Sequence, residues 1–442
     1  MGAEAESPSG DPFPPDEGPI GADLLPSTAD RGADGRLRVG GVDLVTLADE
    51  MGTPLFVYDE AHLRFRCREA VIAWGDGVAY ATKAFLCTAM ARLAYEEGMG
   101  LDVSTGGELH VALSAGVPAA RLVMHGNNKS SEELARAIEV GVGRIVVDSF
   151  DEIDRLAKLT GTVVGGGGPG VLLRVTPGVE AHTHDFVRTG QEDSKFGFGL
   201  SSGAATEAVA RIRALPGVRL IGVHAHIGSQ IFRVESFADE VEALVGFFAP
   251  LDLGELCIGG GLGVAYVTGE RAPSLTQWAQ IVHDACRRAG LPDNVRLTAE
   301  PGRSIVATAG ITLYRVGTIK ELPGLRTYVA VDGGMSDNPR PVLYGSGYEA
   351  FLPREPGATR PRAVRVVGKH CESGDVVVAD ARVPADISLG DVLATPVTGA
   401  YGYAMASNYN KVPRPAVVFV ADGAARVVVR RETDDDLVRL DG

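Results

Sequence analysis

Short apolar runs alternate with amphipathic runs along the chain from about residue 55 to residue 305. The apolar runs are rich in Val, Ile, Leu and Ala, which is typical of strands buried on both faces of a parallel sheet. The intervening runs, such as 107–113 and 131–138, have the apolar spacing of helices that pack against such a sheet. We expect strands at residues 78–83, 100–103, 121–125, 144–148, 171–175, 219–224, 255–258 and 295–299. Eight strands alternating with helices predict a closed parallel (β/α)8 barrel, with an open doubly wound sheet as the alternative.

Beyond the eighth expected strand, the pattern changes to strand-like runs with almost no helical run between them. This change predicts a second, all-β domain over residues 309–442, either a sandwich or a small barrel. The segment 31–54 also contains a strand-like run, so we expect it to join the β domain and residues 55–308 to form the α/β barrel. Residues 1–30 are rich in Pro, Gly, Asp and Glu, and we expect them to form a disordered tail.

The chain of 442 residues has a net charge of −15 and 45% hydrophobic residues. An acidic chain without a basic stripe is a poor candidate for binding nucleic acid or anionic membranes. The five cysteines are far apart and lack C-x-x-C spacing, which argues against a disulfide framework or a zinc site and favours the reducing cytoplasm. No apolar run is long enough to span a bilayer, and the first residues lack the basic-then-apolar pattern of a secretory signal.

The first expected strand of the barrel ends in a lysine, Lys83. Burial at the tip of a strand would lower the pKa of its ammonium toward neutrality. A neutral amine is a nucleophile that forms Schiff bases with aldehydes. The alternative is a lysine that reaches from the strand end back to solvent.

Polar residues or glycines follow all eight expected strands. In a parallel barrel these strand ends meet at one rim, where catalytic groups gather. The first such residues are Lys83, Asp102, His125, Asp148, Arg174, His224, Gly259 and Glu300. Ordinary turn residues would not be expected to include so many ionisable side chains.

Three glycines, Gly259, Gly260 and Gly261, follow the seventh expected strand. Backbone N–H groups without side chains can approach an anion closely, and this place in a barrel is the usual phosphate site. Ser229, which follows the sixth strand, could add a hydroxyl to the same phosphate. The alternative is a set of tight turns.

His226 offers a flat ring at the end of the sixth strand, suited to stacking on a heteroaromatic cofactor. The alternative is a histidine hydrogen-bonded inside the barrel. His224 and His226 share one strand face and could also ligate a metal. No carboxylate or cysteine accompanies them in ligand spacing, so we expect no metal site.

Glu300 is the most informative carboxylate of the rim. A glutamate placed on a pyridine nitrogen keeps that nitrogen protonated, and the ring then becomes a strong electron sink. Such a ring would favour decarboxylation.

The β domain adds a second group of candidates, led by Cys371 and Glu372 in a polar, turn-forming stretch. A cysteine there would expose a thiol able to deliver a proton, whereas the alternative is a small buried hydrophobe. Arg340 and Tyr344 lie in or after one loop-like stretch, and Tyr401 lies in another. The alternative for the tyrosines is packing between strands.

Six stretches together resemble the alanine-racemase-like, fold-type III enzymes that use pyridoxal 5'-phosphate (PLP), and within that group the diaminopimelate decarboxylases. The resemblance covers about residues 40 to 420. The stretches are Tyr80-Ala81-Thr82-Lys83-Ala84, His224-Ala225-His226-Ile227-Gly228-Ser229-Gln230, the glycines 259–261, Glu300-Pro301-Gly302-Arg303, Cys371-Glu372-Ser373-Gly374-Asp375 and Gly399-Ala400-Tyr401-Gly402.

The resemblance implies a PLP-binding TIM barrel and a role for each matching residue. Lys83 is similar to the lysine that holds PLP through a Schiff base, and His226 to the residue stacked on the ring. Glu300 is similar to the partner of the pyridine nitrogen, and Arg174 is expected near the ring hydroxyl. The residues implied around the phosphate and the rest of the cofactor are Ser229, Gly260, Gly261, Gly302, Arg303 and Tyr401.

The resemblance also implies that Cys371 protonates the Cα atom after carbon dioxide leaves. In this family the cysteine and its neighbours enter the active site from the second subunit. We therefore expect a homodimer whose two active sites are shared across the interface.

The expected substrate is meso-2,6-diaminopimelate, converted to L-lysine and carbon dioxide in the last step of lysine biosynthesis. Its end distal to the reaction carries a carboxylate and an ammonium, which need a cation and an anion. Arg303 and Arg340 can bind the carboxylate together with Tyr344 and Tyr401, and Glu372 can bind the ammonium.

Two alternatives stay open at this point. A decarboxylase of ornithine, arginine or carboxynorspermidine needs no arginine at the distal end, and Arg303 with Arg340 speaks against it. A PLP-binding homologue without catalysis would not need Lys83 and Cys371, which are both intact.

Overall fold

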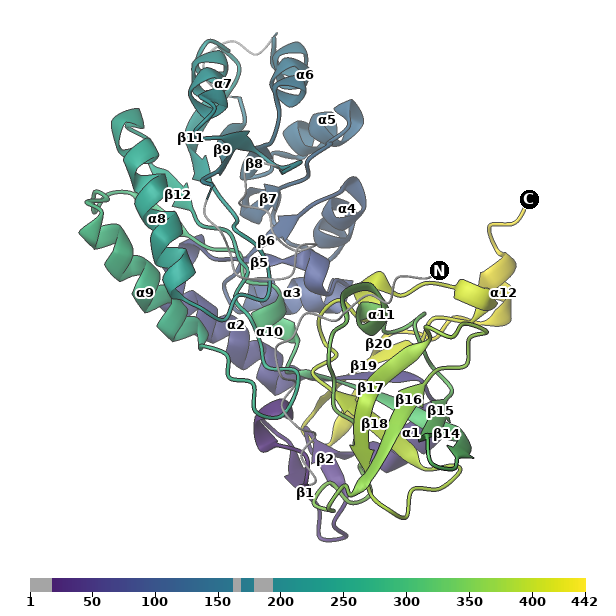
Figure 1. Ribbon diagram of the computed structural model, residues 1–442. Coiled ribbons are helices and arrows are strands. Elements are labelled where there is room, and N and C mark those ends of the chain that lie inside the picture. The colour runs from purple at the N-terminus through teal and green to yellow at the C-terminus, as the bar shows by residue number, and fades with distance from the viewer. Residues whose placement is uncertain (1–17, 162–167, 179–193) are drawn as a thin grey trace, which may run out of the picture.

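The chain folds into two domains that lie side by side (Figure 1). The computed structural model describes residues 18–161, 168–178 and 194–442. The larger domain is a parallel barrel covered by helices, and the smaller one is built mainly of antiparallel strands. The expected combination of an α/β barrel with a β domain is confirmed.

Eight parallel strands form the barrel in the order β5-β6-β7-β8-β9-β11-β12-β13. The N–H groups of Ala79 and Ala81 in the first strand donate hydrogen bonds of 3.0 and 3.1 Å to carbonyls just past the last strand. The sheet therefore nearly closes on itself, as expected, and is not an open doubly wound sheet. The strands are β5 (Ala79–Ala81), β6 (Gly100–Val103), β7 (Leu122–Met124), β8 (Arg144–Val147), β9 (Gly170–Thr176), β11 (Arg219–His224), β12 (Glu255–Cys257) and β13 (Arg296–Thr298), with β10 (Phe198–Gly199) paired to β9.

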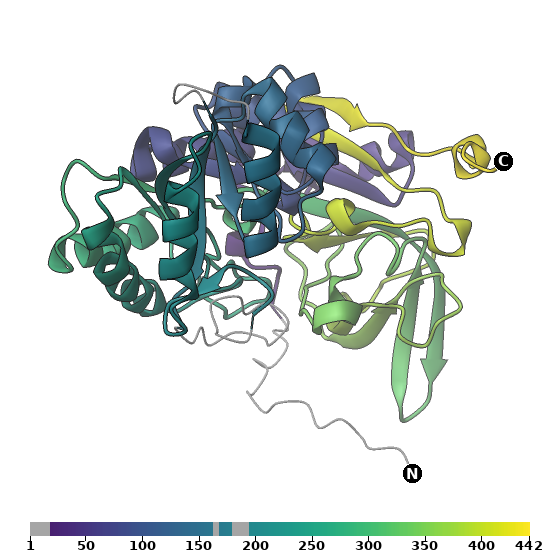
Figure 2. The ribbon, with the colours of Figure 1, turned by 90° about the horizontal axis from the view of Figure 1, so that it is seen from above.

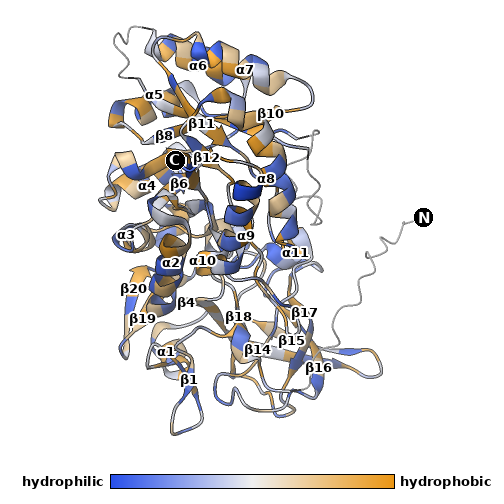
Figure 3. Ribbon diagram, turned by 90° about the vertical axis from the view of Figure 1, so that its left-hand side faces the viewer, coloured by the Kyte–Doolittle hydropathy of each residue, from blue (hydrophilic) through white to orange (hydrophobic). Residues whose placement is uncertain are grey.

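Eight long helices cover the outside of the barrel (Figure 1). They are α2 (Glu60–Trp74), α3 (Thr88–Glu96), α4 (Gly106–Ser114), α5 (Ser131–Val140), α6 (Phe150–Thr160), α7 (Ala204–Arg213), α8 (Glu235–Phe248) and α9 (Leu275–Arg288). Local sequence sets where they begin: Ser130 caps α5 and Ser274 caps α9, each in a capping box. Figure 3 shows polar and apolar segments on α6 and α7, as expected for helices that face the barrel on one side and solvent on the other.

The β domain has the strand order β17-β16-β15-β14-β4-β19-β20, with β18 paired to β14. Figure 2 shows it beside the barrel, with one long hairpin extending away from the barrel. Its strands are β4 (Leu55–Asp59), β14 (Gly310–Leu322), β15 (Arg326–Val331), β16 (Arg362–Val367), β17 (Val376–Val383), β18 (Val392–Pro396), β19 (Ala416–Ala421) and β20 (Ala424–Val429). Three short helices complete the chain: α10 (Arg303–Val306), α11 (Arg340–Tyr344) and α12 (Asp434–Val438).

Strand β4 belongs to the β domain, although we expected the barrel to begin at residue 55. Its five residues are all buried, and it lies between β14 and β19. An apolar run of this kind fits the centre of either sheet, and the sequence pattern does not distinguish the two. The α/β part therefore begins with α2, at Glu60.

The N-terminal segment is more ordered than expected. Ile20 and Leu24 are buried, so residues 18–30 are not a disordered tail; residues 1–17 lie outside the described part of the chain. Burial of these two apolar side chains stabilises an ordered conformation of a stretch rich in Pro and Gly. The following residues form a separate small sheet of β1 (Asp30–Arg31), β2 (Leu37–Val39) and β3 (Val42–Asp43), followed by α1 (Leu44–Met51).

The small sheet adjoins the β domain. The N–H of Leu37 donates to the carbonyl of Pro353 at 2.8 Å, and the N–H of Gly423 donates to the carbonyl of Gly40 at 2.7 Å. Within the part of the chain that the structure describes, every helix is too short or too polar to cross a membrane.

Candidate active site

A cavity of about 570 Å³ opens at the carboxyl ends of the barrel strands, where the β domain meets the barrel. Twelve of the residues predicted from the sequence line it: Lys83, Arg174, His226, Ser229, Gly260, Gly261, Glu300, Gly302, Arg303, Arg340, Tyr344 and Tyr401. The structure thus brings together residues that are up to 318 positions apart in the chain, from Lys83 to Tyr401.

Lys83 lies in a short turn (Thr82–Ala84) directly after β5, and its side chain projects into the cavity. The side chain is exposed to the open space of the cavity. Burial would lower the pKa of Lys83, but the negative charges nearby, Asp102 first among them, raise it above its usual value. The expected shift toward neutrality is therefore wrong, because that expectation left out the carboxylates at the neighbouring strand ends.

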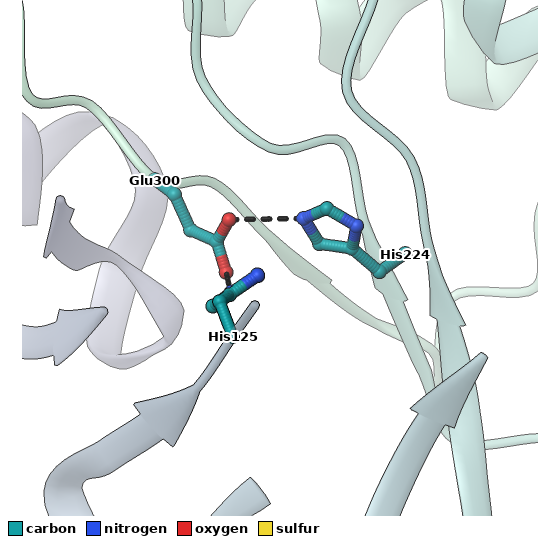
Figure 4. Close-up of side chains that lie close together, drawn as sticks. All are labelled: His125, His224 and Glu300. Atoms are coloured by element: carbon teal, nitrogen blue, oxygen red, sulfur yellow. Dashed lines mark hydrogen bonds and ion pairs between the residues drawn. The ribbon is translucent and has the colours of Figure 1, made fainter. Parts of the chain in front are cut away.

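Glu300 lines the cavity and lies between two histidines (Figure 4). The Nε2 atom of His125 is 2.9 Å from its Oε1 atom, and the Nε2 atom of His224 is 3.0 Å from its Oε2 atom. Burial alone would raise the pKa of Glu300, but the two histidines hold it well below its usual range. The carboxylate is therefore ionised.

The pKa values of the two histidines shift in opposite directions. Burial lowers the pKa of His224 to about 4, which makes this ring neutral. Burial also acts on His125, but the carboxylates of Asp102 and Glu300 outweigh it and raise the pKa of His125. The Nε2 atom of His125 lies 3.7 Å from an oxygen of Asp102.

His226 is fixed by the glycine segment. The N–H of Gly260 donates to its Nδ1 atom at 3.0 Å, so the proton of the neutral ring lies on Nε2. Burial, with the positive charges of Lys83 and Arg174, holds the pKa of His226 well below its usual value. His226 therefore presents an uncharged ring to the cavity.

The glycine segment leaves no room for side chains. A Cβ atom on Gly260 would lie 2.3 Å from the carbonyl oxygen of Glu300. Gly261 has a φ of +112°, and a Cβ atom there would lie 2.3 Å from the carbonyl oxygen of Gly228. The backbone of this segment can therefore approach a ligand more closely than any side chain would allow.

Two further arginines line the cavity. Arg303 donates hydrogen bonds to the hydroxyl of Tyr266 at 2.6 Å and to the hydroxyl of Ser229 at 2.9 Å. Arg340 donates to the hydroxyls of Tyr348 at 2.9 Å and Ser346 at 3.0 Å. Both guanidinium groups are thus held in place by neutral partners, which leaves their charge for an anion.

Arg174 occupies another wall, 3.4 Å from a carboxylate oxygen of Asp148. Its guanidinium carbon lies 4.3 Å from the centre of the Phe196 ring. Burial lowers the pKa of Arg174, and Asp148 opposes this effect.

Cys371 and Glu372 do not line the cavity of their own chain. They lie on the connection between β16 and β17, where both are exposed. The hydroxyl of Tyr409 donates to a carboxylate oxygen of Glu372 at 2.5 Å. Among the predicted site residues, these two are the ones that the single chain does not bring to the cavity.

Four further residues of the site were not assigned a role from the sequence: Asp102, His125, His224 and Tyr266. Asp102, His125 and His224 follow or end barrel strands, which was a usable signal. Tyr266 lies in the long connection after β12, where no periodicity marks it.

His125, His224 and Glu300 are also, among the residues that the structure describes, a group able to hold a metal ion. The pair weighed from the sequence was His224 with His226, and the ring nitrogen Nδ1 of His226 instead accepts a backbone hydrogen bond. The nitrogen–oxygen distances of 2.9 and 3.0 Å to Glu300 are those of charge-assisted hydrogen bonds.

Comparison with known proteins identifies the family to which the chain belongs. The family described as pyridoxal-dependent decarboxylase, pyridoxal binding domain, matches residues 61–307. A diaminopimelate decarboxylase of Mycobacterium tuberculosis is 48% identical over 96% of this chain and 98% of its own length. That of Bacillus subtilis is 47% identical over 95% of this chain and 98% of its own. The chain belongs to the diaminopimelate decarboxylase family.

Solved structures of this family agree with the fold. A diaminopimelate decarboxylase of M. jannaschii in complex with L-lysine superposes with a TM-score of 0.86 at 33% identity, covering 94% of this chain and 98% of that one. One from Helicobacter pylori, also with L-lysine, has a TM-score of 0.80 at 30% identity and covers 89% and 98%. The predicted family, fold and cofactor class are confirmed.

The site of this diaminopimelate decarboxylase family member fits PLP. The glycine segment excludes any Cβ atom, and the buried Oγ of Ser304 and Nε of Arg303 have no hydrogen-bond partner among the described residues. Orphaned donors beside a bare backbone suit a phosphate. The neutral ring of His226, the anionic Glu300 and the amine of Lys83 suit the ring face, the ring nitrogen and the aldehyde.

Proposed function

We propose that this protein removes one carboxylate from meso-2,6-diaminopimelate and releases L-lysine and carbon dioxide. The observation that carries the proposal is the pair Arg303 and Arg340, which line the same cavity as Lys83 and Glu300. A substrate with a second carboxylate needs such cations away from the reacting carbon. The relatives named diaminopimelate decarboxylase support the same assignment.

In this proposal, residues that line the cavity would hold the cofactor. Lys83 would supply the amine that holds PLP, and the backbone of Gly260 and Gly261 would hold its phosphate with Ser229, Gly302, Arg303 and Tyr401. His226 would cover the ring face, and Arg174 would lie near the ring hydroxyl. When bound, PLP supplies an electron sink for the pair left by carbon dioxide.

The substrate is oriented by its distal end. Arg303 and Arg340 bind the distal carboxylate, with hydrogen bonds from Tyr344 and Tyr401. The D-configured carbon is then presented to the reacting end of the cavity. This positioning converts binding energy at the remote end into orientation at the reacting end.

We further propose that the protein is a homodimer and that Cys371 and Glu372 serve the cavity of the partner subunit. Both are exposed and outside the cavity of their own chain, so they are free to reach another one. Cys371 would donate its thiol proton to the carbon that lost carbon dioxide, and Glu372 would accept the distal ammonium. A symmetric pair would then hold two complete sites.

We place the protein in the cytoplasm. Its five cysteines are all free thiols, which agrees with a reducing compartment.

The proposal is tested by measuring carbon dioxide release from the purified, PLP-loaded protein. Meso-diaminopimelate, its LL isomer, ornithine and arginine are offered in parallel, and the amine product is identified. We expect lysine from the meso isomer only. Release from ornithine or arginine would instead show a decarboxylase of the same fold with a different distal pocket and would overturn the roles of Arg303 and Arg340.

A further inference from the structure

The carboxylate of Glu300 is clamped between side chains from distant strands. His125 follows β7, His224 ends β11 and Glu300 follows β13, so the three side chains meet across the barrel mouth (Figure 4). All three are at least nine-tenths buried. Each carboxylate oxygen of Glu300 forms a hydrogen bond with the Nε2 atom of one histidine, at 2.9 and 3.0 Å. The orientation of the carboxylate plane is therefore fixed by two contacts rather than one.

The two contacts are not equivalent. The Nδ1 atom of His224 is buried and has no hydrogen-bond partner among the described residues, so its proton lies on Nε2 and is donated to Glu300. The Nε2 atom of His125 faces two carboxylates, Glu300 at 2.9 Å and Asp102 at 3.7 Å. A protonated His125 lies between these two buried carboxylates, whereas His224 supplies only a neutral donor.

The position of His125 has a consequence for any group bound above Glu300. Two buried carboxylates without a cation between them would share a proton, because both cannot ionise at low cost. In a protonated Glu300, one oxygen carries the proton, so the group is no longer an anionic acceptor for a protonated ring nitrogen. His125 is thus placed to control the charge and the orientation that Glu300 offers.

We infer that His125 is a positioning residue that holds the Glu300 carboxylate in one orientation and in its ionised form beneath the ring nitrogen of the bound cofactor. The inference rests on the proposed function for one assignment only, that Glu300 faces the ring nitrogen. His125 need not touch the cofactor or the substrate.

The test uses the full-length protein and three substitutions. His125→Gln keeps an amide donor without the charge, His125→Leu removes donor and charge, and His224→Gln exchanges one neutral donor for another. His110→Gln, at an exposed position of α4, is the matched control. The absorption spectrum and the dissociation constant of bound PLP are measured first, without substrate, and kcat and KM for meso-diaminopimelate are measured next.

We expect His125→Leu to change the cofactor spectrum, to weaken PLP binding about tenfold and to lower kcat about 100-fold, because a preorganised charged donor in a dry site is worth that much. His125→Gln should show the same spectral change with a smaller loss of affinity. His224→Gln should change the spectrum less than His125→Gln does, and His110→Gln should match the unmodified protein. KM should change by less than about threefold, since the distal arginines are untouched.

The inference is overturned if His125→Gln and His125→Leu keep the spectrum, the PLP affinity and kcat of the unmodified protein, or if His224→Gln changes the spectrum as much as His125→Gln. If His125→Leu does not fold, as judged by its thermal unfolding, His125→Gln alone decides. The spectrum and affinity need no substrate. A protein that turns over no diaminopimelate but shows the spectral change would therefore refute the proposed function and leave this inference standing.

Discussion

Arg303 and Tyr266 are joined by a hydrogen bond of 2.6 Å between the guanidinium and the phenol hydroxyl. The same tyrosine ring lies 5.0 Å from the guanidinium carbon of Arg340. One tyrosine therefore sets the positions of both arginines that we assign to the distal carboxylate. Its own position is held by burial and by a backbone hydrogen bond of 2.7 Å to Glu270.

Removing only the hydroxyl, by Tyr266→Phe, should loosen Arg303. A hydrogen bond to a charged group contributes about 1.5–3 kcal/mol, and since Tyr266 acts through Arg303, we expect KM for meso-diaminopimelate to rise about tenfold. We expect kcat to change by less than about threefold. Steady-state kinetics give both values, and Tyr95→Phe on α3, away from the cavity, is the control. An equal fall in kcat with unchanged KM would contradict this role.

The glycine segment, residues 259–261, gives a second prediction. Gly260→Ala puts a Cβ atom 2.3 Å from the carbonyl oxygen of Glu300, so the backbone must move at the expected phosphate site. We expect the affinity for PLP to fall by about tenfold or more, measured by titrating the cofactor-free protein. Gly254→Ala is the matched control. Gly254 lies just before β12, the strand that Gly260 follows, and a Cβ atom there would meet nothing within 4 Å. Equal affinities of the two variants would exclude a phosphate at Gly260.

Much of this site could be predicted from the sequence, because barrel strands are short apolar runs and their carboxyl ends converge on one rim. That rule places Lys83, His226 and Glu300 at the rim, and the resemblance to the family assigns their roles. The role of His125 could not be predicted, since it depends on distances across the barrel to Asp102 and Glu300.

Other features were hidden for different reasons. Strand β4 has the pattern of any doubly buried strand, so only its pairing shows that it belongs to the β domain. Tyr266 lies in a connection without periodicity, where no local rule marks a functional side chain. The net direction of the Lys83 pKa depends on the balance between burial and neighbouring carboxylates, which requires coordinates.

Lys83 gives a prediction on the rate of cofactor loading. Burial opposes but does not overcome the carboxylates that raise the pKa of Lys83, so its amine is protonated at neutral pH and must lose a proton to attack an aldehyde. The loading rate of cofactor-free protein should therefore rise about tenfold for each pH unit. Asp102→Asn removes the carboxylate that contributes most to the raised pKa and should speed loading at fixed pH. Stopped-flow absorbance measures the rate. A pH-independent rate in the unmodified protein would contradict this account.

His62 predicts how stability depends on pH. Burial lowers the pKa of His62 to about 4, and its Nδ1 atom accepts a hydrogen bond from the N–H of Ser27 at 3.0 Å. The folded-state pKa lies below the unfolded value of about 6.5, so the unfolded chain binds the proton first and stability falls as pH drops from about 6.5 to 4. The loss from this group should be roughly 3 kcal/mol. His62→Asn keeps an acceptor for Ser27 without titrating in this range.

Urea unfolding of the unmodified protein and of His62→Asn at several pH values isolates the contribution of His62 to the free energy of unfolding. Other buried groups titrate in both proteins alike, so the difference in unfolding free energy between the two is the quantity to follow. We expect that difference to shrink, or to reverse, between pH 7 and pH 4.5. Parallel curves would show that His62 does not carry the pH dependence.

Substitutions of Lys83 and Cys371 test whether the active site is shared between two subunits. The structure places Lys83 in the cavity and leaves Cys371 exposed outside it. Lys83→Ala and Cys371→Ala should each lower activity by at least about 100-fold, because each removes a reacting group. If the sites are shared, a heterodimer of the two variants contains one site with both defects and one site with neither. Co-expression with two different affinity tags and purification on both tags in turn isolates that heterodimer.

We expect the purified heterodimer to show about half of the activity of the unmodified dimer, since one of its two sites is intact. Homodimers of either variant carried through the same steps are the controls. A heterodimer as inactive as the homodimers would mean that each chain uses its own cysteine, which would require the β16–β17 connection to fold into its own cavity. Full activity in a monomer, shown by sedimentation of the active species, would contradict sharing in another way, because a single chain leaves Cys371 away from Lys83.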